Sequence, residues 1–129
     1  MAEVVIDASA LLALLNAERG ADVVAEALPH GAISAVNLSE VVAKLAGAGM
    51  PEKSIRQTLQ PLGIRVVPFD DEQAYQAGLL ISSTQARGIS LGDRACLSLA
   101  KMLGAVALTA DRSWAELSVG VSVNLIRRL

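Results

Sequence analysis

The sequence predicts an α/β protein built of three layers, with helices on both faces of a parallel sheet. Short apolar stretches alternate with longer stretches of helical periodicity, and the apolar stretches are continuous rather than interrupted by polar residues. The chain has 129 residues, of which 53% are hydrophobic and 19% are charged. This length can bury a core, and no internal repeat, low-complexity tract or linker interrupts it, so we expect one domain over residues 1–129.

The first half of the chain contains three of the predicted strands and four of the predicted helices. In chain order they are a strand at 4–6, helices at 8–16 and 21–28, a weak strand at 32–33, helices at 38–46 and 51–59, and a strand at 64–67. The strand at 4–6 is a run of β-branched residues, and the helix at 38–46 repeats apolar residues at the spacing of one helical face. Pro51 suits a first helical position. The helix stops are Pro29 with Gly31, Gly47 with Gly49, and Pro61 with Gly63.

The second half of the chain continues the alternation. We expect a helix at 71–86 that ends in Arg87-Gly88, a helix at 92–103 that ends at Gly104, a strand at 105–108, a short helix at 114–117 and a strand at 121–126. A glycine directly after a helical pattern is a typical helix end. This makes five strands and completes the predicted sheet.

Composition excludes several classes of protein. The longest stretch without a charged residue, 73–86, has 14 residues, whereas a membrane span needs about 18 or more apolar residues, so we expect no transmembrane helix. Glu3 and Asp7 precede any basic residue, which is unlike a secretory signal and predicts a cytoplasmic protein. With one cysteine and one histidine, an internal disulfide and a site with several histidines are excluded.

Four carboxylates fall near one predicted edge of the sheet. Asp7 follows the first strand, and Asp111 follows the fourth strand after two residues. Glu40 is expected in the first turn of the helix after the second strand, and Asp93 in the first turn of the helix before the fourth. Ligands of open parallel sheets bind beyond the carboxyl ends of the strands. If the first and fourth strands are neighbours, these acids converge.

Each acid also has a purely structural interpretation. Asp7 and Asp111 are at positions that cap the following helix. Asn37 to Glu40 and Ser90 to Asp93 resemble capping boxes, and Glu40 is also spaced to pair with Lys44.

The joint arrangement favours a metal site. Two carboxylates about 4 Å apart repel by roughly 4 kcal/mol at an effective dielectric constant near 20, which caps or one lysine do not offset. Mg²⁺ or Mn²⁺ takes oxygen ligands and activates water for the hydrolysis of a phosphodiester without any histidine. If four of the 13 acids bind metal, the other nine face 11 basic residues, so a nucleic-acid substrate remains compatible with the net charge of −2.

Four motifs resemble, in order and spacing, those of the PIN domain, and most closely those of the VapC toxins of toxin–antitoxin pairs. They are Val5-Ile6-Asp7-Ala8-Ser9, Asn37-Leu38-Ser39-Glu40-Val41, Ser90-Leu91-Gly92-Asp93 with Cys96, and Leu108-Thr109-Ala110-Asp111.

The resemblance covers essentially the whole chain. It implies a sheet with strand order 3-2-1-4-5, a Mg²⁺- or Mn²⁺-dependent endoribonuclease, a homodimer, and a small antitoxin protein that obstructs the active site. By motif match it makes Asp7, Glu40, Asp93 and Asp111 the metal-binding acids, with Ser9 and Thr109 supporting them.

Several other residues have competing interpretations. Asp70 and Asp71 open a helix, where acids suit the helix dipole, although they could also join an acidic pocket. Cys96 is expected in the core, and His30 in an exposed loop. Trp114 is expected to pack a short helix into the core, with contact to RNA or a partner as the alternative.

Three arginines lie beside the motifs. Arg87, Arg94 and Arg112 either position phosphates or belong to a solvated surface.

Two other functions compete with a nuclease. A phosphoacceptor signalling domain also gathers acids around Mg²⁺, but it needs an acidic pair after the first strand and a lysine after a late one. Here the pair at 70–71 follows the third strand, and Thr109-Ala110-Asp111 occupies the place of the lysine. The other alternative is a binding module with capped helices and no metal.

Overall fold

A computed structural model describes residues 3–84 and 88–127. Five parallel strands form one sheet in the order β3-β2-β1-β4-β5. The strands are β1 (Val4–Ile6), β2 (Gly31–Ser34), β3 (Arg65–Val67), β4 (Val106–Thr109) and β5 (Val123–Leu125). The predicted class and strand order are therefore confirmed, and β1 and β4 are neighbours.

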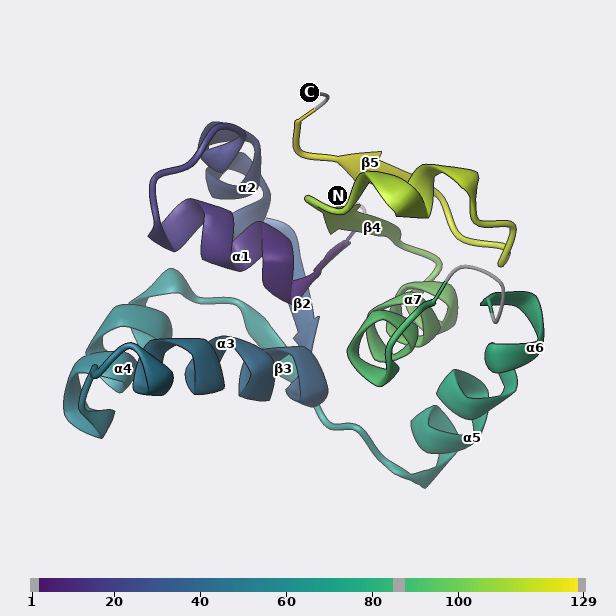
Figure 1. Ribbon diagram of the computed structural model, residues 1–129, viewed down its shortest axis with the longest axis horizontal. Coiled ribbons are helices and arrows are strands. Elements are labelled where there is room, and N and C mark those ends of the chain that lie inside the picture. The colour runs from purple at the N-terminus through teal and green to yellow at the C-terminus, as the bar shows by residue number, and fades with distance from the viewer. Residues whose placement is uncertain (1–2, 85–87, 128–129) are drawn as a thin grey trace.

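Seven α-helices and three 3-10 turns connect the strands in the described part of the chain. The helices are α1 (Ala8–Leu15), α2 (Ala21–Ala27), α3 (Ala35–Gly47), α4 (Glu52–Leu59), α5 (Asp71–Leu79), α6 (Ile81–Thr84) and α7 (Leu91–Leu103). The 3-10 turns are Leu28–His30, Gln60–Leu62 and Arg112–Glu116. Figure 1 shows α1 to α4 gathered on the left of the view and α5 to α7 on the lower right. None of these helices is long and apolar enough to cross a membrane.

The central strand β1 divides the core into two parts. Val5 belongs to a cluster that contains Leu97 of α7, whereas Ile6 belongs to a second cluster with Leu11 of α1 and Val24 of α2. Successive side chains of a strand point to opposite faces, so a strand covered by helices on both sides must be apolar at every position. This explains the continuous apolar run that predicted the three layers.

Two predicted helices differ from the structure by more than two residues at one end. Helix α3 begins at Ala35 rather than at residue 38, because Ser34 ends β2 and its hydroxyl accepts a hydrogen bond from the Val36 N–H (3.2 Å). The predicted helix at 71–86 is divided into α5 and α6 at Leu80, and residues 85–86 lie outside the described residues. Gly78 weakens the end of α5, while Leu80 is buried in the same cluster as Val5.

The prediction of an exposed loop at His30 is wrong. His30 is half-buried and ends a 3-10 turn that contains Pro29 in its first positions, where the fixed φ of proline favours a tight helical start.

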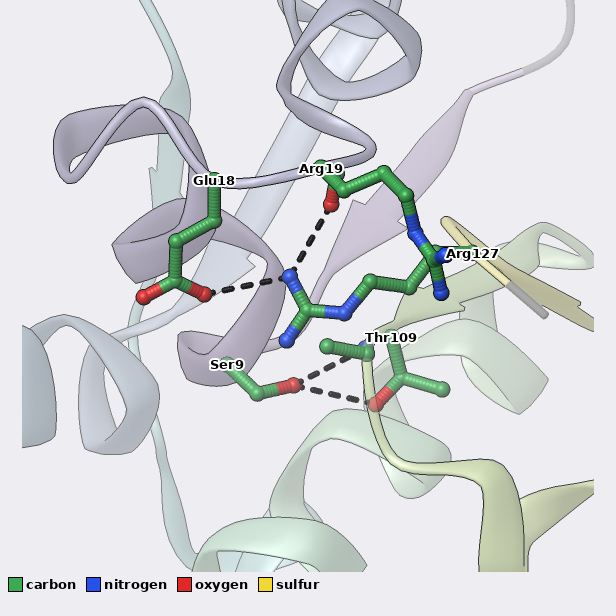
Figure 2. Close-up of polar contacts among 6 residues, drawn as sticks. Ser9, Glu18, Arg19, Thr109 and Arg127 are labelled. Atoms are coloured by element: carbon green, nitrogen blue, oxygen red, sulfur yellow. Dashed lines mark hydrogen bonds and ion pairs between the residues drawn. The ribbon is translucent and has the colours of Figure 1, made fainter. Parts of the chain in front are cut away.

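The end of β5 is tied to the connection between α1 and α2. Arg127 Nη1 donates to Glu18 Oε1 (3.1 Å) and to the Arg19 carbonyl oxygen (2.9 Å), as Figure 2 shows. Gly20 has a φ of +96°, and a Cβ there would lie 2.7 Å from the Ile126 carbonyl oxygen. Both the left-handed conformation and this close approach require glycine. These contacts fix the segment after the edge strand β5 to the connection between α1 and α2.

Candidate active site

Asp7 lies at the carboxyl end of the central strand and is almost fully buried. Its side chain is 4% exposed. Although Asp7 occupies the N-cap position of α1, its side chain makes no capping hydrogen bond. Instead its Oδ2 accepts from Ser9 Oγ (2.6 Å) and from Thr109 Oγ1 (2.9 Å). The capping interpretation of Asp7 is therefore wrong.

The surroundings of Asp7 oppose its negative charge. The pKa of Asp7 is raised from 3.8 to about 6, chiefly by burial and also by the negative charges of Asp93 and Glu40, against the hydrogen bonds from Ser9 and Thr109, which lower it. No lysine or arginine of the described residues offsets these charges at Asp7. The site thus carries uncompensated negative charge, which a buried carboxylate does not tolerate without a partner.

Two hydroxyl groups join the ends of β1 and β4. Ser9 Oγ lies 3.1 Å from Thr109 Oγ1 and accepts from the Ala110 N–H (3.0 Å), while Thr109 Oγ1 accepts from the Asp111 N–H (3.0 Å). Figure 2 shows the Ser9 and Thr109 side chains facing one another. Both hydroxyls bind Oδ2 of Asp7, and its Oδ1 has no hydrogen-bond partner among the described residues.

Glu40 is an exposed residue in the second turn of α3, not in the first turn as predicted. Its Oε1 accepts a hydrogen bond from Asn37 Nδ2 (2.9 Å). The capping box predicted at 37–40 is wrong, because α3 has already begun at Ala35. The ion pairs among the described residues do not include one between Glu40 and Lys44.

Asn37 joins α3 to α7 and was missed as a separate site residue. Its Nδ2 also donates to the Gly92 carbonyl oxygen (2.9 Å), and its Oδ1 is buried without a hydrogen-bond partner among the described residues. A buried amide oxygen left unpaired costs about 1–3 kcal/mol. The sequence carried one signal: Asn37 precedes buried Val41 by four residues, so it lies on the apolar face of its helix.

Asp93 has the capping role that the sequence predicted, and it also lies close enough to Asp7 to act on it electrostatically. It is half-buried in the first turn of α7 and forms a capping box, in which the Ser90 N–H donates to Asp93 Oδ2 (3.1 Å) and the Asp93 N–H donates to Ser90 Oγ (3.2 Å). The negative charge of Asp93 raises the pKa of Asp7, so the two carboxylates interact electrostatically.

The Asp111 side chain forms the local cap that the sequence predicted for it. It is exposed and caps the 3-10 turn, with Oδ1 accepting from the Ser113 N–H (2.9 Å) and from Ser113 Oγ (2.7 Å). Its charge is not among those that raise the pKa of Asp7. The structure brings the charges of Asp7, Glu40 and Asp93 together and places Asp111 nearby through its backbone bond to Thr109.

The chemistry of these donors fits a hard divalent cation. Across residues 3–84 and 88–127, no three acidic, histidine or cysteine side chains already lie close enough together to enclose an ion. Asp7, Glu40 and Asp93 nevertheless present oxygen donors only, which Mg²⁺ and Mn²⁺ prefer, and none of them takes part in an ion pair found among the described residues.

Cys96 and Trp114, which lie near the motifs, both belong to the hydrophobic core. Cys96 is fully buried in the core as expected, and burial, followed by the charges of Asp7, Asp93 and Glu40, raises the pKa of its thiol. Trp114 is fully buried, which confirms its packing role.

The acidic pair at the start of α5 is also structural. Asp70 caps α5, with Oδ1 accepting from the Gln73 N–H (2.9 Å), and Asp71 lies in the first turn. This confirms the helix-start interpretation of the pair.

The three arginines have different positions. Arg94 is half-buried, and its Nη1 donates to the Ala77 carbonyl oxygen (3.0 Å) in α5, so it does not lie on a fully solvated surface. Arg112 is exposed. Arg87 lies outside the described residues.

Comparisons with known proteins agree with this architecture. Ribonuclease VapC42 of Mycobacterium tuberculosis is 32% identical over 110 residues, which cover 78% of this chain and 84% of that protein. A toxin–antitoxin complex from Klebsiella pneumoniae contains a chain with a TM-score of 0.76 and 21% identity, covering 98% of this chain and all of that one.

A further similar structure is VapC20 of Mycobacterium tuberculosis, described as a toxin that cleaves the sarcin–ricin loop. Its TM-score is 0.74 at 20% identity, covering 93% of this chain and 99% of that one. The model of the PIN domain matches residues 4–120. The chain therefore belongs to the PIN domain family.

Proposed function

We propose that this protein is a Mg²⁺- or Mn²⁺-dependent endoribonuclease and the toxin of a toxin–antitoxin pair. The observation that carries the proposal is the buried Asp7 at the end of the central strand, whose pKa is raised by burial and by the charges of Asp93 and Glu40. The similarity to ribonuclease VapC42 supports RNA as the substrate, and the similarity to the Klebsiella complex supports an antitoxin partner.

Asp7, Glu40 and Asp93 would hold the cation. A divalent ion bound there neutralises charge on a scissile phosphate and lowers the pKa of water. We propose Asp111 as a fourth ligand of the cation. Its Oδ1 accepts hydrogen bonds from Ser113, so Oδ2 is the oxygen that would bind the cation.

The chain's own groups prepare the acids for this task. Ser9 and Thr109 bind one oxygen of Asp7 and leave the other for a ligand. The capping box fixes the Asp93 carboxylate at the start of α7. Orientation by surrounding hydrogen bonds is a general requirement of metal sites, and these contacts supply it for Asp7 and Asp93.

An RNA strand can approach this edge of the sheet. Glu40 and Asp111 are exposed and Asp93 is half-buried, so the acids open onto the surface. Glu40 also lines a shallow hollow of about 620 Å³ with Pro68 and Phe69. Without a cation these acids repel a phosphate backbone, so the proposed metal is needed for binding as well as for hydrolysis.

The decisive experiment compares RNA cleavage by the wild type and by Asp93→Asn in the presence of Mg²⁺ or Mn²⁺. We expect the wild type to release products with a 5′ phosphate and a 3′ hydroxyl, EDTA to stop cleavage, and Asp93→Asn to be inactive. Asp71→Asn is the matched control, because Asp71 is also an acid in the first turn of a helix. Equal cleavage by Asp93→Asn and the wild type would reject the proposed function.

We also propose that the protein forms a homodimer. Exposed apolar side chains lie on α5 and α7, among them Tyr75 (71% exposed), Leu79 (66%) and Leu91 (52%). A contiguous exposed apolar patch marks a surface that a partner covers, and the helices that carry these side chains, α5 and α7, pack against each other. Sedimentation equilibrium should give twice the mass of the chain for the wild type and a reduced mass for Tyr75→Glu/Leu79→Glu, and a monomeric wild type at micromolar concentration contradicts this part of the proposal.

A further inference from the structure

We infer that Asn37 and Gly92 together set the position of the Glu40 carboxylate, which makes Asn37 a positioning residue of the site. The inference rests on the proposed function, since it assigns Glu40 to the cation. It is carried by the two hydrogen bonds of the Asn37 amide, one to Glu40 and one to Gly92 of α7, and by the close approach of the Glu40 carboxylate to Gly92.

The Asn37 amide is held in one orientation. Its side chain is 0% exposed, and Nδ2 donates to Glu40 Oε1 and to the Gly92 carbonyl oxygen, both at 2.9 Å. Both partners are acceptors, and the NH₂ group carries two hydrogens, one for each of them. The reverse orientation would place the amide oxygen against two other oxygens, so the two contacts together fix which atom faces Glu40.

Glu40 needs such a donor to stay where it is. It is an exposed side chain with several rotatable bonds, and no ion pair involving it is found among the described residues. The neighbouring charges of Asp7 and Asp93 repel it. The Asn37 amide offsets this repulsion and holds one carboxylate oxygen beside the start of α7.

Gly92 leaves the space that the carboxylate occupies. A Cβ at this position would overlap both Glu40 carboxylate oxygens and lie 2.6 Å from Cδ. Gly92 is not among the glycines with positive φ, and glycine is a poor helix former. The backbone of α7 therefore does not require glycine here, whereas the Glu40 carboxylate does.

The unpaired oxygen of Asn37 argues against a purely structural role. Oδ1 is buried without a hydrogen-bond partner among the described residues. A buried amide that satisfies only its donor is unfavourable for folding. The hydrogen bond that its NH₂ group donates to Glu40 explains why asparagine occupies position 37.

The test is a double-mutant cycle on Mn²⁺ binding. Asn37→Ala and Gly92→Ala are made in the wild type and in Glu40→Ala, and the Mn²⁺ Kd is measured by calorimetry. Each single variant should weaken binding about 10- to 100-fold, as loss of an orienting partner does. In the Glu40→Ala background each should add less than a twofold change, because the group they position is gone.

Two metal-free measurements separate positioning from folding. Gly92→Ala should unfold at the same or a higher temperature, since alanine is the better helix former and the displaced group is the flexible end of a side chain. In NMR spectra, the Asn37 side-chain amide protons should shift in Gly92→Ala and in Glu40→Ala. Ser98→Ala is the matched control, because it also loses a buried hydrogen bond on α7, to Gln73, and should leave Mn²⁺ binding unchanged.

Three results would overturn the inference. One is an unchanged Mn²⁺ Kd in Asn37→Ala, the second is an equal loss in both backgrounds, and the third is an Asn37 amide signal that does not respond to Glu40→Ala. A wild type that neither binds Mn²⁺ nor cleaves RNA refutes the proposed function itself, and the inference with it. The NMR result is readable in every case, even where Glu40→Ala binds Mn²⁺ too weakly for calorimetry.

Discussion

Replacing Asp7 by asparagine should stabilise the metal-free protein at neutral pH. Burial and the charges of Asp93 and Glu40 raise the pKa of Asp7 from 3.8 to about 6. At 1.36 kcal/mol for each pKa unit, the ionised carboxylate lowers the free energy of unfolding by about 3 kcal/mol. Asp7→Asn removes this charge and keeps an acceptor oxygen for the hydroxyls of Ser9 and Thr109.

The pH dependence follows from the direction of the shift. Below pH 3.8 the carboxyl group is neutral in both folded and unfolded chains, so it has no effect on stability. Between pH 3.8 and about 6 the folded chain retains a proton that the unfolded chain releases, and stability falls as the pH rises. Above that range the destabilisation is complete. The advantage of Asp7→Asn should therefore grow from near zero at low pH to about 3 kcal/mol at pH 7.

Urea denaturation in EDTA between pH 3.5 and 8 measures this difference, because the comparison of two variants cancels the other carboxylates. Mn²⁺ at 100 times its Kd should then return about 2.7 kcal/mol to the wild type and nothing to Asp7→Asn. Parallel pH profiles, or a loss of about 1 kcal/mol or more in Asp7→Asn at pH 7 as expected for a removed cap, would refute the reasoning.

Three further predictions follow from the same contacts. Thr109→Val removes one of the two hydroxyl donors to Asp7, so the pKa of Asp7 should rise further in an NMR titration, and an unchanged pKa contradicts the assigned hydrogen bond. Asp111→Asn keeps an acceptor for Ser113 and should change metal-free stability by less than about 0.5 kcal/mol while weakening Mn²⁺ binding in calorimetry; an unchanged Kd leaves Asp111 with its cap alone. Burial raises the pKa of the Cys96 thiol, so a thiol reagent at pH 8 should modify the protein only after urea unfolding, and rapid modification of the folded protein contradicts this.

Much of the fold could be predicted because several local patterns agreed. The continuous apolar run before Asp7 predicted a strand covered on both faces, and the glycines and prolines placed most helix ends. The strand order came from the resemblance to the PIN domain, since no local pattern determines which strands are neighbours. The break at Leu80 was missed because its side chain is buried in the core, a tertiary contact that helix periodicity does not report.

The site was predicted less completely than the fold. Asn37 was misread because Ser34 and Asn37 are both good N-cap residues three positions apart, and only the end of β2 at Ser34 decides between them. For Asp111 the sequence predicted the cap that the structure confirms, but it could not decide between this cap and a place in the acidic site. The Asp111 carboxylate can bind Ser113, two residues away, or approach the acids of other elements. The contact with Ser113 orders fewer residues and therefore costs less conformational entropy.

The hydrogen bond between Thr109 and Asp7 spans 102 positions of the chain. A growing polypeptide that has not yet reached Val106 lacks the strand that pairs with one side of β1, and it also lacks a hydroxyl that holds Asp7. Asp7 is therefore synthesised 102 positions before the residue that donates the second hydrogen bond to its carboxylate. Under the proposed function, a ribosome making this nuclease is not exposed to its activity until β4 and Thr109 have been translated.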